Sequence, residues 1–206
     1  LRVERRSLAF ACASAAIVGF VQPHGVAAIT DPLTADIATR SVWLAGPMFF
    51  CSTIGIAIAL SQGPGRHAFL DTSERSAPLF GRELARAKAL TPVLSATLAT
   101  FVYWAAQFLS GFAAPPTFFI LALACVIAST LVALNATVRT GLARLTALGL
   151  AAATIVVAYI LAVYADAYST KRGDAVGVAT ELIVCGIIAF VALRQYGESL
   201  AGYDPL

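Results

Sequence analysis

Charged residues are scarce in this chain of 206 residues, which carries 14 Lys and Arg and 11 Asp and Glu, together 12% of the sequence. Soluble domains carry about a quarter charged residues. Hydrophobic residues make up 59%, and the mean hydropathy is +0.83. So few charges cannot cover the surface of a water-soluble domain of this size. The composition therefore excludes a soluble enzyme, a nucleic-acid-binding protein and a disordered chain, and predicts an integral membrane protein.

Residues that carry catalysis are equally scarce. The two histidines, His24 and His67, fall on opposite sides of the membrane in the topology given below. No Cys-x-x-Cys pair, Gly-x-x-x-x-Gly-Lys-Ser/Thr phosphate loop, magnesium-binding aspartate pair or nucleophile elbow is present. The four cysteines stand alone in apolar runs, where cysteine usually behaves as a small hydrophobic residue; they are Cys12, Cys51, Cys125 and Cys185. These absences disfavour an enzyme and predict neither a cofactor nor a metal site.

Long apolar runs dominate what is present. A helix that crosses a bilayer needs about 20 apolar residues. Runs of that kind cover residues 8–22, 42–61, 89–112, 116–138, 145–165 and 175–193, with a polar loop expected at 166–174. They lack the alternation of membrane β-strands, so we predict one all-α transmembrane domain over 1–206 with about six helices. The first run is either a retained helix, which we favour, or a cleaved signal peptide with a basic start and small residues at 26–28.

The positions of Lys and Arg predict the orientation, because cytoplasmic loops carry an excess of both. With the N-terminus inside, the cytoplasmic segments hold eleven of them: Arg2, Arg5, Arg6, Arg66, Arg75, Arg82, Arg86, Lys88, Arg139, Arg144 and Arg194. The outer segments hold three: Arg40, Lys171 and Arg172. Both termini are therefore predicted to be cytoplasmic. Aromatic residues expected at the outer boundary are Trp43, Tyr103, Trp104, Tyr164 and Tyr168.

Three polar residues fall inside predicted spans. Glu181 lies seven residues past Asp174, about 10 Å into the last helix at 1.5 Å per residue. An ionisable residue at membrane depth indicates a functional site, although Glu181 could also reach water at the interface or pair with Lys171 or Arg172. Gln107 and Asn135 are better explained as interhelical hydrogen bonds than as ligand contacts.

Pairs of small residues four apart allow helices to approach closely. Gly55 with Ala59, Ala124 with Ala128, and Gly149 with Ala153 are such pairs. In a chain this rich in alanine, they indicate a packed helical bundle and no specific partner.

The cytoplasmic segment 66–88, between the second and third spans, is the most informative part of the chain. Its candidate partner-binding residues are Asp71, Glu74, Arg75, Pro78, Arg82, Glu83, Arg86 and Lys88. A helix that starts near Gly81 would place Arg82 and Arg86 on one face and run unbroken into the third span. Such an amphipathic element suits docking to a soluble partner, and equally suits basic side chains that reach lipid phosphates.

The six-helix order and the string Pro-x-x-x-Arg-Glu-Leu-x-x-x-Lys resemble the permease subunit of type-2 ABC transporters. The matching residues are Pro78, Arg82, Glu83, Leu84 and Lys88. In that family, a short coupling helix before the third span inserts into the ATPase subunit, and residues 71–76 would occupy its place here.

The resemblance implies a permease half of an ATP-driven exporter in a bacterial inner membrane, with ATP hydrolysis on a separate chain. The expected partners are an ATP-binding-cassette ATPase subunit, a second permease subunit in a homo- or heterodimer, and membrane lipids, with no nucleic acid. The alternative function is a non-catalytic membrane scaffold or accessory subunit of a larger complex.

Overall fold

The structure is a computed structural model that describes residues 2–27, 37–62, 81–111, 116–172 and 174–201. These residues form helices joined by turns, without a strand. The elements are α1 (Arg2–Ala27), α2 (Ile37–Ala45), the π-helix η1 (Gly46–Cys51), α3 (Ser52–Gln62), α5 (Gly81–Leu109), α6 (Pro116–Asn135), α7 (Gly141–Arg172) and α8 (Asp174–Ala201).

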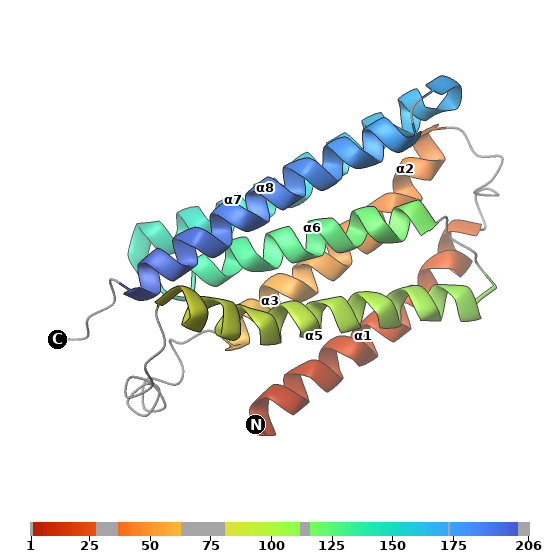
Figure 1. Cartoon of the computed structure of the whole chain (residues 1–206). Helices are drawn as coiled ribbons and strands as arrows, with labels where there is room; N and C mark the ends of the chain where they lie inside the picture. Colours follow the sequence, from red (N-terminus) through yellow and green to blue (C-terminus); the bar gives the residue numbers. More distant parts are fainter. Residues whose placement is uncertain (1, 28–36, 63–80, 112–115, 173, 202–206) are drawn as a thin grey trace.

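Six helical segments in the described part of the chain are long and apolar enough to cross a membrane. They are Arg6–His24, Ser41–Ser61, Arg86–Leu109, Pro116–Asn135, Gly141–Tyr164 and Val176–Ser199. The chain is thus a multi-pass helical membrane protein, which confirms the predicted fold class. Successive spans run in opposite directions, so both termini lie at the same end of the bundle (Figure 1). Which end faces the cytoplasm remains a prediction.

Two elements differ from the sequence prediction. The prediction of a polar loop at 166–174 is wrong for residues 166–172. These residues contain no helix breaker and continue α7 to Arg172. The second span is interrupted by η1, where Pro47 lies at the start of a six-residue π-helix. A proline has no N–H to donate to the helix, and π-helical segments are often found at functional sites.

Two helices end earlier than predicted. The third span ends at Leu109 because Ser110 and Gly111 turn back, with Gly111 at a φ of 86° that favours glycine. The amide of Gly111 donates to the carbonyl of Phe108 at 3.1 Å. The fourth span ends at Asn135, since the amides of Ala136 and Thr137 form turn bonds to Ala133 and Leu134.

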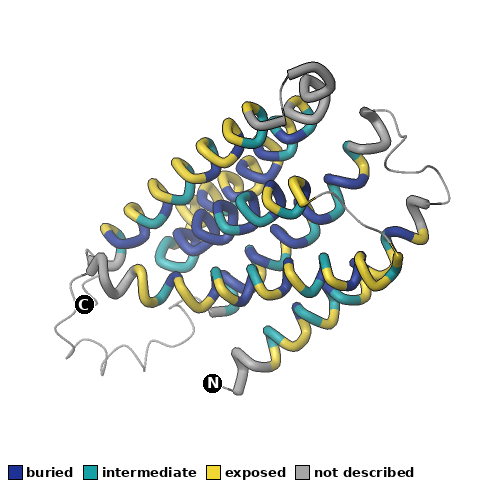
Figure 2. The backbone as a smooth tube through the Cα atoms, turned by 45° about the vertical axis from the view of Figure 1, so that its right-hand side comes forward, coloured by how far each residue is buried: buried dark blue, intermediate teal, exposed yellow. Residues whose placement is uncertain are grey.

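The centre of the bundle is α6. Buried residues make up 67% of its span and only 17% of the span on α8. It packs against α3, α5, α7 and α8, and buried positions are concentrated along it while the outer faces of its neighbours are exposed (Figure 2). These exposed faces are apolar, as lipid contact requires.

Candidate functional site

The first candidate site is the start of α5. This helix begins at Gly81, as predicted, and runs unbroken through the third span to Leu109. Arg82, Glu83, Arg86 and Lys88 therefore all belong to its first turns, and Arg86 is exposed. The other proposed partner-binding residues of the 66–88 segment lie outside the described residues; they are Asp71, Glu74, Arg75 and Pro78.

The next turn of α5 is anchored in the bundle. Ala89 is buried and shares a core cluster with Leu134 at the end of α6 and with Ala192 and Tyr196 on α8. Tyr196 is only 1% exposed. A displacement of the first turns of α5 would therefore disturb a core cluster to which α6 and α8 also contribute.

The second candidate site is Glu181 on α8. The buried residues of this helix include Glu181, Cys185, Ala192 and Tyr196, spaced by 4, 7 and 4 positions along one helical stripe. Glu181 therefore lies on the buried face of α8, which packs against α6 and α7. Its exposure is 0%, and neither carboxyl oxygen has a hydrogen-bond partner among the described residues.

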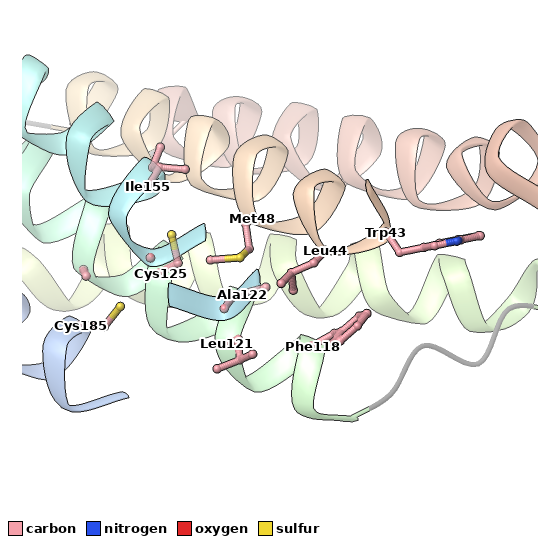
Figure 3. Close-up of a cluster of buried hydrophobic side chains, with 12 residues drawn as sticks. Trp43, Leu44, Met48, Phe118, Leu121, Ala122, Cys125, Ile155 and Cys185 are labelled. Carbon is pink, nitrogen blue, oxygen red and sulfur yellow. The ribbon is translucent and has the colours of Figure 1, made fainter. Parts of the chain in front are cut away.

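Two cysteine thiols lie near Glu181. Cys125 on α6 and Cys185 on α8 are close enough to Glu181 to interact with it electrostatically. The sulfur atoms of both cysteines and of Met48 point into one buried cluster (Figure 3). Ser52 on α3 and Cys125 share a hydrogen bond of 3.4 Å between Oγ and Sγ.

The burial of Glu181 bears on one of the two alternatives for this residue, contact with water, whereas its pairing with Lys171 or Arg172 stays a prediction. Contact with water at the interface is excluded in this conformation by its burial. The side chains of Lys171 and Arg172 lie outside the described residues. Among the described residues, the Glu181 carboxyl has no counter-charge. Ionisation of such a carboxyl at membrane depth costs a few kcal/mol of free energy.

Gln107 and Asn135 make the interhelical hydrogen bonds that the sequence predicts. The side-chain amide of Gln107 donates to Gln22 on α1 at 3.4 Å and to the Tyr103 hydroxyl at 3.3 Å. The amide of Asn135 donates to the carbonyl of Ala192 on α8 at 3.0 Å. Their contacts join α5 to α1 and α6 to α8, and a structural role explains both.

A small aromatic cavity lies beside Gln107. Its volume is about 10 Å³, and Trp43, Pro47, Tyr103 and Phe118 contribute to its wall. That is the space of about one water molecule. Trp43 and Tyr103 are 2% and 1% exposed, so both pack inside the bundle, and their depth in the membrane stays a prediction.

The structure does not bring the candidate residues into one site. Glu181 lies near the start of α8, whereas Ala89 of α5 shares a core cluster with Ala192 and Tyr196 near the end of α8. Sequence reasoning missed Gln22 and the Ser52–Cys125 contact. A glutamine within the first apolar run was the available signal for Gln22, whereas nothing in the sequence pairs Ser52 with Cys125.

The described residues contain no group of three or more His, Cys, Asp or Glu side chains that could hold a metal ion. No protein-family model matches the chain, and no curated protein or solved structure matches it either. A functional conclusion must therefore come from the residues and their packing.

Proposed function

We propose that the chain is the permease subunit of an ATP-driven exporter of the type-2 ABC class, placed in a bacterial inner membrane. The observation that carries the proposal is the continuity of α5, which starts three residues after Pro78 and reaches Leu109 as one helix. The part of the family-like string from Arg82 to Lys88 and the third span thus belong to one helix. ATP hydrolysis takes place on a separate ATPase chain.

The packing of α5 supports a mechanical role. It contacts α1, α3, η1, α6 and α8, so that a tilt of α5 displaces most of the bundle. In the proposed cycle, closure of the ATPase subunits moves the 66–88 segment, α5 follows, and Ala89 transmits the movement to Tyr196 and Leu134. Because packed cores do not deform continuously, the helices shift as units.

The proposal includes a second permease subunit, identical or homologous. Movement of α5 would open a path between the two subunits toward the outer side. The apolar outer faces of the helices make such a path suited to an amphipathic or lipid-like substrate and unsuited to a small ion.

The test is charge reversal at the start of α5. Glu83→Lys should lower the transport-coupled ATP hydrolysis of the complex about tenfold, a coupling free energy of about 1.4 kcal/mol, while membrane insertion stays intact. Glu198→Lys is the matched control, because Glu198 is exposed on α8 and paired only with Arg194, at 2.8 Å. Unchanged coupling in Glu83→Lys would contradict the role of this segment and favour the membrane scaffold.

A further inference from the structure

We propose that Glu181 is an intramembrane proton-binding site, whose carboxyl takes up and releases one proton as α6 and α8 move relative to each other. The supporting observation is a carboxyl of 0% exposure whose two oxygens accept no hydrogen bond from the described residues. This site lies near the start of α8, and it does not depend on an ATPase partner.

Packing determines the class of ligand. Ala122 and Cys125 of the same cluster are 0% exposed, and Ala158 is 1% exposed. A ligand with volume, such as a substrate or a lipid headgroup, would require these helices to separate widely. A metal ion would need several ligands, and the described residues hold no group of three suitable side chains. A proton needs neither space nor further ligands.

The groups that face Glu181 leave its charge uncompensated. Among the described residues, α6 contributes the Cys125 thiol and α8 the Cys185 thiol. The titratable residue of α7 in this cluster is Tyr159, whose hydroxyl donates to the carbonyl of Ser41 at 3.2 Å. The third helix packed on α8 is α5, which contributes no hydrophobic side chain to this cluster. None of these described groups is cationic, and in the proposal a proton is the charge that neutralises the carboxylate.

The chemistry is a simple proton transfer. When α6 and α8 part, water reaches the carboxylate, hydronium gives up one proton, an O–H bond forms on Glu181 and one water is released. Closure of the helices then retains the neutral acid in the apolar cluster. Buried carboxyls at membrane depth serve as proton relays in pumps and transporters.

The experiment uses dicyclohexylcarbodiimide, an apolar reagent that modifies protonated carboxyls, on the full chain in membranes, followed by peptide mass mapping. We expect Glu181 to be modified, the modification to decrease as pH rises, and the labelled peptide to be lost in Glu181→Gln. Glu198, exposed on the same helix, is the internal control and should react instead with a water-soluble carbodiimide and an amine.

Three results would overturn the proposal. These are no modification of Glu181 at any pH, modification that does not change with pH, and modification by the water-soluble reagent to the same extent as Glu198. If Glu181→Gln does not fold, mapping of the unaltered chain over pH still decides the question. Because no ATPase is needed, a negative result here leaves the proposed coupling through α5 untouched.

Discussion

At the scale of single residues, the polar side chains of the spans fall into two kinds. Asn135 and Gln107 donate hydrogen bonds to neighbouring helices, so their polarity is matched within the bundle. Glu181 is as deeply buried but has no such partner among the described residues. We therefore expect substitutions at the first two to change stability and a substitution at Glu181 to change function.

Asn135→Ala should weaken the contact between α6 and α8, because it removes the hydrogen bond to the carbonyl of Ala192 at 3.0 Å. Interhelical hydrogen bonds in membrane proteins contribute about 0.6 kcal/mol on average and at most about 1.7 kcal/mol. The free energy of unfolding in mixed detergent micelles measures the loss. Thr146→Ala is the control, since Thr146 is exposed and bonds only to Leu142 of its own helix. Equal stability of the two variants would show that the Asn135 bond contributes nothing.

At the scale of helices, the sequence predicts those features that depend on local composition. The six spans follow from apolar runs, and the start of α5 follows from Gly81 and the charged residues behind it. The extension of α7 to Arg172 differs from the predicted loop because polar residues can continue a helix beyond its apolar region. The π-helix η1 depends on the packing around Pro47, which no local pattern specifies.

Pairings between helices are the part that the sequence does not predict. Gly55 and Gly149 have the same small-residue spacing, yet only Gly55 faces a neighbour: a side chain there would overlap the Thr130 hydroxyl on α6, whereas one at Gly149 would meet nothing within 4 Å. Likewise, Glu181 was recognised as a candidate from its depth, but its lack of a partner depends on the contacts of α8 with α6 and α7.

The contact between α1 and α5 depends on Gly19. A Cβ atom at this position would overlap the backbone carbonyl of Tyr103, and a backbone carbonyl cannot rotate away as a side chain can. Gly19→Ala should therefore push α1 from α5, lengthen the bond of Gln22 to Gln107, and lower stability by about 1–3 kcal/mol.

The matched control for Gly19→Ala is Gly186→Ala on α8, where an added Cβ meets nothing within 4 Å. Thermal unfolding in detergent compares the two variants. If both melt at the same temperature, α1 and α5 do not pack as closely as the structure shows.

At the scale of the whole molecule, most of the basic residues in the described helices belong to one end of the bundle, whereas Arg40, Lys171 and Arg172 belong to the other. Arg6, Arg86, Arg139, Arg144 and Arg194 all belong to the end that carries both termini and the start of α5 (Figure 1). Basic residues favour the cytoplasmic side, which predicts that this end is cytoplasmic; in the proposed function the ATPase docks there. The proposed proton site at Glu181 lies toward the other end, near the start of α8.

The most direct test of the proposed function is photo-crosslinking in native membranes from a reactive residue placed at position 75. We expect an adduct with an ATP-binding-cassette ATPase, identified by mass spectrometry. A second probe at Leu142, which is 80% exposed at the same end on α7, should give no such adduct. Adducts with lipid alone from position 75, or the same ATPase captured equally from both positions, would contradict docking through the 66–88 segment.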